Sequence, residues 1–378
     1  MKINIILQVL CSSLILYGCI SDFNVEGIDE TANILVVEGI ITDDETVITL
    51  SRSLNLTDKN DDTVSYCVDF AKVYVACDDG TSYHADSYYS DDGRYTIRTG
   101  RLNPDRSYCL KIEIEESDCS GDGLPCTVKT MEYGTDFSYP IQTPEIDSVF
   151  WVKRGGGQPV MIHVATHSPD NSVLYCRWSY KEDWEINSSL SVIGYPFYCW
   201  SRAANSDLLL GSSGNTVMGK ITDRIAEIDP SDMKFSTLYR IDVTQNAISK
   251  RAYDYFANVK KNVRQTGGIF APIPSEVQGN ITCMTDPGRP VIGYVDVSTT
   301  TGGRLYISKR DVYEPPFTYI CRFLSLSEVC EECGIPEAQC NQFNVQDRYI
   351  LSEMLYVRVE CVDCTYFGTT QKPDDWPD

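Results

Sequence analysis

Three histidines and two Cys-x-x-Cys pairs are the residues of this 378-residue chain whose spacing could support metal chemistry. His163 and His167 are four residues apart, which on a helix would place both on one face. Their context, Val160–Thr166, alternates as a strand does, and strand residues four apart lie about 13 Å from each other. One ion cannot reach both side chains, so we expect no metal site there. The third histidine, His84, stands apart from both.

The two Cys-x-x-Cys pairs are Cys330 with Cys333 and Cys361 with Cys364, and Cys340 lies between them. This spacing resembles that of a zinc ribbon, which a cytosolic protein would use to hold Zn²⁺. In an exported protein the same spacing favours disulfides. We therefore predict disulfides, no metal and no cofactor, although the spacing does not decide which cysteines pair.

Other motifs of catalysis or ion binding are incomplete. The acidic run 58–62, and Asp118 with Asp122, lack the spacing and the closing glutamate of an EF-hand, so both are expected to be solvated loops. The segment 211–214 (Gly-Ser-Ser-Gly) lacks the spacing of a nucleophile elbow. No convincing set of serine, histidine and acid is present, and we expect a protein that is not an enzyme.

The first eighteen residues have the pattern of a bacterial lipoprotein signal. Lys2 precedes an apolar run, Ile3 to Leu16, that is shorter than the ~20 residues needed to cross a bilayer. Gly18 then stands directly before Cys19, as a small residue does in a lipobox. We predict cleavage before Cys19 and lipidation of its thiol and amine, with residues 19–32 as a tether. Several acyl chains on one residue give stable anchoring, since each buried CH₂ contributes about 0.8 kcal/mol.

The remaining composition indicates an exported, folded body. Loss of Lys2 takes the formal charge from -22 to about -23, which argues against nucleic acid and anionic lipid headgroups as partners. The content of 42% hydrophobic and 11% aromatic residues argues for a packed core rather than disorder.

Sixteen cysteines are present, and fourteen remain when Cys11 of the signal and Cys19 are set aside. An even number in an oxidising compartment predicts several disulfides. The candidates are Cys67, Cys77, Cys109, Cys119, Cys126, Cys176, Cys199, Cys283, Cys321, Cys330, Cys333, Cys340, Cys361 and Cys364. Five precede residue 140 and nine follow it, so either one bridge joins the two parts or each part keeps a free thiol.

Short alternating segments separated by turns predict a mainly β protein with a few helices. Strands expected near 34–37, 47–50, 72–76, 94–97 and 108–112 indicate an N-terminal β-sandwich, Ig-like or transthyretin-like, over residues 33–140. A larger β-rich domain is expected over 141–378, with a cysteine-rich C-terminus. One helix is predicted near 246–265, where apolar residues recur at helical spacing and Gly267-Gly268 follows.

Several segments together resemble a family of Bacteroidota outer-membrane lipoproteins known as a domain of unknown function. They are 35–39 (Leu-Val-Val-Glu-Gly), 146–148 (Ile-Asp-Ser), 249–256 (Ser-Lys-Arg-Ala-Tyr-Asp-Tyr-Phe), 279–281 (Gly-Asn-Ile) and 291–294 (Val-Ile-Gly-Tyr), with Cys361 to Cys364, Lys372-Pro373 and Trp376 at the end. Their order, more than any one of them, carries the resemblance. Members are commonly encoded beside TonB-dependent receptors, so the resemblance implies such a partner. It implies no catalytic residues.

We therefore expect an outer-membrane lipoprotein that works as a binding partner of a TonB-dependent transporter in nutrient uptake. The cell surface is the favoured location, and the periplasmic leaflet stays open. Two alternatives are a structural or adhesive envelope protein without a small ligand, and a hydrolase. The aromatic stretch with Tyr195, Phe197, Tyr198 and Trp200 is the candidate contact for partner or ligand, with burial in the core as the alternative.

A short acceptor motif for O-glycans is also present. Asp62-Thr63-Val64 fits the pattern found on exported Bacteroidota proteins and lies in a polar stretch. Asp147-Ser148-Val149 fits it too but is expected in a strand. We predict Thr63 as the modified residue.

Overall fold

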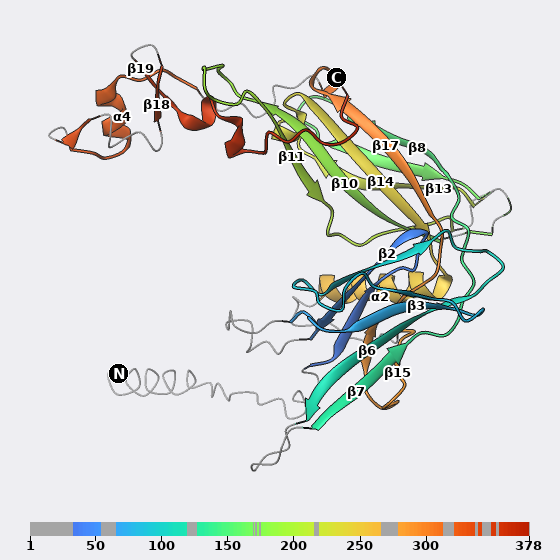
Figure 1. Ribbon diagram of the computed structural model, residues 1–378. Helices are drawn as coiled ribbons and strands as arrows, with labels where there is room; N and C mark the ends of the chain where they lie inside the picture. Colours follow the sequence, from blue (N-terminus) through green and yellow to red (C-terminus); the bar gives the residue numbers. More distant parts are fainter. Residues whose placement is uncertain are drawn as a thin grey trace, which may run out of the picture.

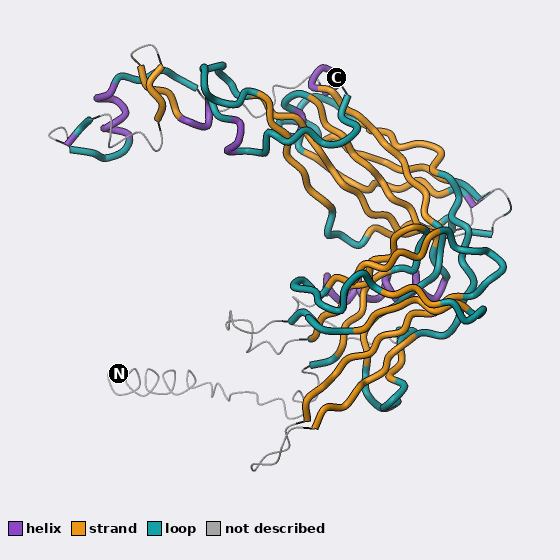
Figure 2. Tube along the Cα trace, viewed as in Figure 1, coloured by secondary structure: helices purple, strands orange, loops and turns teal. Residues whose placement is uncertain are grey.

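A computed structural model describes residues 33–53, 66–118, 127–168, 170, 172–173, 175–214, 219–265, 279–312, 321–336, 339–341, 349–352 and 355–377. Strands dominate these residues and helices are few, as Figure 2 shows, which confirms the predicted mainly β class. The strands form two layered halves joined at an angle, with a small cysteine-rich unit at one end (Figure 1). The predicted signal, the tether, Cys19 and Thr63 lie outside the described residues.

The first half consists of two facing sheets. One has the order β16-β1-β2-β5, with bounds Val291–Gly293, Leu35–Gly39, Asp44–Arg52 and Arg94–Gly100. The other has the order β15-β7-β6-β3-β4, with bounds Thr282–Cys283, Thr127–Gly134, Tyr108–Asp118, Lys72–Cys77 and Ser82–His84. Alternate residues of each sheet point inward and form one core, which includes Leu35, Ile48, Val75 and Leu110.

Two strands of the first half come from far along the chain. Val36 in β1 pairs in parallel with Ile292 in β16, and Cys283 in β15 pairs with Tyr133 in β7. Side chains between residues 281 and 297 join the core of the first half. The predicted boundary at 140/141 therefore needs a correction, because residues 281–297 of the expected second domain complete the sandwich of the first. Periodicity predicts a strand but does not identify its partner.

The second half also has two sheets. The larger has the order β11-β10-β14-β17, with β12 paired beside β11 on β10; the bounds are Tyr198–Ala204, Tyr175–Asn187, Leu238–Ala247, Thr300–Ser308 and Leu209–Ser212. The smaller is β13-β9-β8, with bounds Ile221–Ile228, Val160–Thr166 and Ile146–Val152. Their shared core includes Ile162, Trp178 and Ile241. The short η4, Met233–Phe235, precedes β14.

The predicted helix near 246–265 is present as α2, Lys250–Gln265. Ser249 caps it, because its Oγ accepts a hydrogen bond from the backbone N–H of Ala252 at 3.1 Å. The buried face of α2 packs with Ile40 of the first half and with Tyr175 and Leu210 of the second. The helix is therefore a bridge between the halves (Figure 1).

The C-terminal unit lies at the far end of the second half (Figure 1). It contains α4, β18, β19, η7 and η8, with bounds Leu326–Glu332, Tyr349–Ser352, Leu355–Arg358, Val359–Cys361 and Cys364–Tyr366. The short α3, Lys309–Val312, follows β17 directly and packs through Val312 into the core of the second half. Beyond η8 the chain returns along the larger sheet, where Thr369 pairs with Trp200 in β11. Trp376 then lies against Arg240 and Tyr306 of that sheet.

Candidate functional site

A cavity of about 710 Å³ lies where the two halves meet. One wall is the segment between β1 and β2 together with the start of β2. The other is the face of the larger sheet that points away from the core. Its volume is in the range of small-ligand pockets, roughly 300–1,000 Å³. The lining residues are Gly39, Ile40, Thr42, Asp43, Asp44, Glu45, Val47, Arg101, Arg177, Trp178, Ser179, Thr244, Asn246 and Thr300.

The first wall is held in shape by buried hydroxyl groups. The backbone N–H of Thr42 donates to Thr46 Oγ1 at 2.9 Å, and Thr99 Oγ1 donates to the Thr42 carbonyl at 2.6 Å. Thr46 and Thr99 are both buried. The backbone N–H of Leu102 donates to Asp43 Oδ1 at 2.8 Å. This network fixes the segment that presents the carboxylates of residues 43–45 to the cavity.

The second wall follows from strand periodicity. Arg177 in β10 is opposite Asn246 in β14, and Ser179 is opposite Thr244, so these side chains share one face of the sheet. Asn246 Nδ2 donates to Thr300 Oγ1 at 2.9 Å, which holds the amide in place. The alternate residues, such as Trp178, point into the core. The wall is therefore polar and stands on a rigid sheet.

Arg177 is the unusual member of this wall. Its guanidinium carbon lies 5.0 Å from the ring centroid of Phe256 in α2. Burial lowers the pKa of Arg177, and the carboxylate of Glu38 acts in the opposite direction. No hydrogen bond or ion pair joins its guanidinium to any residue that the structure describes. A desolvated guanidinium with unused N–H groups favours the binding of an anion.

The predicted aromatic contacts occupy the β10–β11 turn and the start of β11. Tyr195 and Tyr198 are exposed, and Phe197 packs edge-on against Tyr198 with ring centroids 4.9 Å apart. Trp200 is half-buried, and its backbone pairs with Thr369. These four residues are therefore not all buried in the core. We refer to the exposed Tyr195 and Tyr198, with Phe197 beside Tyr198, as the aromatic patch.

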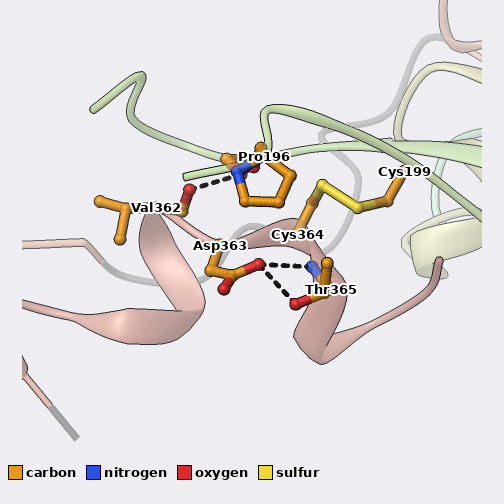
Figure 3. Close-up of a disulfide and its surroundings, with 7 residues drawn as sticks. Pro196, Cys199, Val362, Asp363, Cys364 and Thr365 are labelled. Carbon is orange, nitrogen blue, oxygen red and sulfur yellow. Dashed lines mark hydrogen bonds between the residues drawn. A yellow bond between two sulfur atoms is a disulfide. The ribbon is translucent and has the colours of Figure 1, made fainter. Parts of the chain in front are cut away.

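A disulfide fixes the start of β11, the strand that carries Tyr198. Cys199 of β11 is bonded to Cys364 of η8, as Figure 3 shows. Beside this bond, Asp363 caps η8 by accepting from the backbone N–H of Thr365 at 2.9 Å and from its hydroxyl at 2.6 Å (Figure 3). The Ser188 hydroxyl donates hydrogen bonds to the carbonyl oxygens of both Pro196 and Val362. The backbone on either side of Tyr198 is therefore held in place before any partner binds, which lowers the entropy cost of association.

The prediction of disulfides is confirmed for three pairs, all in the second part. They are Cys199–Cys364, Cys321–Cys361 and Cys330–Cys340. It is wrong for six cysteines whose thiols are free: Cys67, Cys77, Cys109, Cys176, Cys283 and Cys333. Four of these are buried, and three of the four, Cys77, Cys176 and Cys283, pack as small apolar side chains in separate places of the cores. Cys109, for example, is opposite Ala76 rather than Cys77. Cys119 and Cys126 lie outside the described residues.

The histidines have separate surroundings. His163 stacks on Phe150 at 5.3 Å, and His84 stacks on Tyr74 at 5.0 Å. His167 Nδ1 lies 2.7 Å from Asp147 Oδ1 at the surface. Within the described ranges, no group of three or more possible metal ligands is present. The acidic run 58–62 and Asp122 lie outside these ranges. None of the described helices is long and apolar enough to span a bilayer.

Two features have no signal in the sequence, a buried ionic network and the role of Arg177. Arg240 Nη2 donates to Asp183 Oδ2 at 2.6 Å, and both side chains are buried under the returning C-terminus. Strand alternation assigns this pair to the outer face of the sheet, and only the segment that covers the pair accounts for its burial. On the core face of the same sheet, buried Glu182 accepts from Lys234 Nζ and from the Tyr239 hydroxyl.

Comparison with curated proteins and with solved structures identifies no informative relative. No curated protein matches the chain. Among solved structures, a DUF4785 family protein from Legionella pneumophila is 13% identical over 56% of this chain and 52% of its own length, with a TM-score of 0.20. The chicken interferon gamma receptor alpha chain is 14% identical over 57% of this chain and 89% of its own, with a TM-score of 0.17. Neither likeness carries an argument about fold or function.

The family comparison covers both halves of the fold. Residues 20–304 match, from before β1 into β17, so both sandwiches, α2 and the cavity lie inside the match. The cysteine-rich C-terminal unit lies beyond it. The chain therefore belongs to the DUF4249 family, a domain of unknown function.

Proposed function

We propose that this protein is an outer-membrane lipoprotein, anchored through Cys19, that captures a nutrient and works with a TonB-dependent transporter. The observation that carries the proposal of a partner is the aromatic patch. Tyr198 is 57% exposed although it lies beside a disulfide and inside a hydrogen-bonded junction. Rigid, exposed aromatic side chains are typical of binding hot spots.

The position of the patch supports a role in docking rather than in ligand capture. It lies at the junction of β11 with the C-terminal unit, at the end of the second half away from the cavity (Figure 1). A partner bound there would leave the cavity accessible. The proposal assigns no catalytic activity, and the His167–Asp147 pair has no hydroxyl or thiol bonded to it among the described residues.

The test is recovery of an outer-membrane receptor from native membranes with the tagged full-length protein. Tyr195→Ala with Tyr198→Ala removes two side chains of the patch. We expect receptor recovery to fall by at least about tenfold, because hot-spot aromatics contribute roughly 2 kcal/mol or more. Tyr88→Ala is the matched control, since Tyr88 is also 57% exposed but lies in the first half.

Two outcomes would overturn the proposal. If the wild-type protein recovers no receptor, the partnership is wrong. If Tyr88→Ala loses the receptor while the double variant keeps it, the contact lies in the first half instead. Full-length variants are used because residues 281–297 are needed to complete the first sandwich.

A further inference from the structure

Charged groups of both signs line the cavity between the halves. Arg177 provides a cation whose N–H groups have no hydrogen-bond partner among the described residues. On the opposite wall, the carboxylates of Asp44 and Glu45 are exposed to solvent and form no ion pair with any described residue. The whole lining holds two arginines and three carboxylates. A ligand that carries both charges therefore complements this lining at both walls.

The surface between Arg177 and the carboxylates can form hydrogen bonds with the backbone of a peptide. The hydroxyl groups of Ser179 and Thr244 face the cavity side by side and make no hydrogen bond with described residues. Asn246 lies next to them with its amide oriented by Thr300. Apolar contact is supplied by Ile40 and Val47. Hydroxyl and amide groups of this kind can donate to and accept from peptide groups.

We infer that the cavity binds a short peptide with free termini, whose carboxylate is held by Arg177 and whose ammonium group faces the carboxylates of residues 43–45. The inference rests on the capture role proposed above and names its ligand class. Phe256 covers one side of the guanidinium and limits its freedom, so the N–H edge is preorganised for a planar carboxylate.

A phosphate-bearing ligand fits this lining less well. A dianion would gain from Arg177 and Arg101 but would meet three carboxylates in the same cavity. A zwitterion gains at both walls and adds no net charge. A purely cationic ligand also fits less well, because it would leave the half-buried Arg177 without a partner.

The test measures peptide retention by the isolated full-length protein, with a proteolytic digest of casein as the probe. The protein is equilibrated with the digest, separated by filtration, and the retained peptides are counted by mass spectrometry. Portions of the digest are used with free termini, with amidated carboxyl groups, or with acetylated amines. We expect retention with free termini and a loss of about tenfold or more after either modification, because each removes one charge-assisted contact.

Variants assign the two ends of the ligand. Arg177→Gln should lower retention about tenfold and remove the difference between free and amidated peptides. Asp44→Asn with Glu45→Gln should remove the difference between free and acetylated peptides; asparagine is chosen because Asp44 has φ +60°, which asparagine tolerates. Arg202→Gln is the matched control, since Arg202 lies on the same sheet but is 71% exposed and outside the cavity lining. It should retain peptides as the wild type does.

The inference is overturned if the wild type retains no peptide, if amidated peptides bind as well as free ones, or if equimolar inorganic phosphate displaces them. A melting temperature for each variant shows whether it is folded. If Arg177→Gln does not fold, Arg177→Lys serves instead; it keeps the charge but loses the planar fork, and should weaken retention. No transporter is present in this assay, so its result is independent of receptor recovery.

Discussion

Cys199 and Cys364 are 165 residues apart in the chain, and their disulfide joins strand β11 to the helix η8 with a Cα–Cα distance of 5.7 Å. The bond attaches the C-terminal unit to the second half. A disulfide that closes so long a loop removes much entropy from the unfolded chain.

The first prediction is therefore that Cys199→Ser with Cys364→Ser lowers the free energy of unfolding by about 2–5 kcal/mol. Limited proteolysis should also cut after residue 308 more readily than in the wild type. Cys330→Ser with Cys340→Ser is the control, because that bond closes a loop with a separation of only 10 residues inside the C-terminal unit. Equal melting temperatures for wild type and the first variant would contradict the prediction.

The second prediction concerns the free thiols. Alkylation of the denatured, unreduced protein should label six of the described cysteines. In the folded protein Cys333 should react first, and Cys67 more slowly, because burial and then Asp69 raise the pKa of its thiol. Cys176 should be protected until unfolding, since burial raises its pKa to about 12. Peptide mapping by mass spectrometry gives the answer, and disulfide-linked peptides containing Cys77 or Cys109 would show that the assignment is wrong.

The third prediction concerns acid. Glu116 accepts from Arg52 at 2.7 Å and from Arg289 at 2.6 Å. Burial raises the pKa of Glu116, but the hydrogen bonds from Arg289 and Arg52 outweigh it and hold the pKa below its ordinary 4.5. Because the folded pKa is the lower one, the stabilisation is present above about pH 4.5 and is lost as the pH falls through the folded value.

Glu116→Gln tests this linkage. It should cost about 1–3 kcal/mol at neutral pH, the range for hydrogen bonds to a charged group. The difference from wild type should shrink as the pH falls below about 4.5, where the carboxylate of the unfolded chain takes up its proton, and should be lost below the lower pKa of the folded protein. Urea midpoints at neutral and acidic pH measure it. A difference that stays constant across this range would refute the role of the ionised carboxylate.

The fourth prediction concerns Gln245, which is fully buried between the two sheets of the second half. Its Oε1 accepts from Trp178 Nε1 at 2.7 Å, and its Nε2 donates to the Pro144 carbonyl at 2.8 Å. Gln245→Leu would leave Trp178 Nε1 buried without its partner, at about 1–3 kcal/mol, whereas the Pro144 carbonyl keeps the hydrogen bond from Thr301 Oγ1 at 2.9 Å. Chemical denaturation should show this loss, while Thr244→Ala, on the polar face of the same strand, should stay within about 0.5 kcal/mol of wild type.

The fifth prediction follows from the lipobox. Cys19→Ala should release the protein from membranes into the soluble fraction, because the acyl chains that anchor it would be missing. Fractionation with and without detergent measures the change. A variant that still requires detergent for extraction would contradict lipidation at Cys19.

Local pattern predicted the strands well where one side of a strand is buried. Val160–Thr166 alternates buried and half-buried side chains as its sequence indicates, and α2 begins within a few residues of its predicted start. Local pattern could not identify partners. That Cys283 and Ile292 belong to the first half depends on contacts between residues far apart in the chain, for which a single sequence has no signal.

The candidate site could be predicted only in part, because a sequence shows residue types but not contacts between residues far apart in the chain. The aromatic residues around Tyr198 were recognisable because their type alone suggests binding. Arg177 was not, since an arginine at an alternate strand position has the pattern of an ordinary solvated residue. Its position over Phe256 arises only when α2 folds against β10.

The return of residues 281–297 to the first sandwich has a consequence for the order in which the growing chain can fold. β1 leaves the ribosome long before β16, its parallel neighbour, and β7 long before β15. Until then, both strands present open edges on which other chains could add. The first half therefore cannot complete its two sheets until most of the chain has been made, which lengthens the period in which these edges are exposed to aggregation.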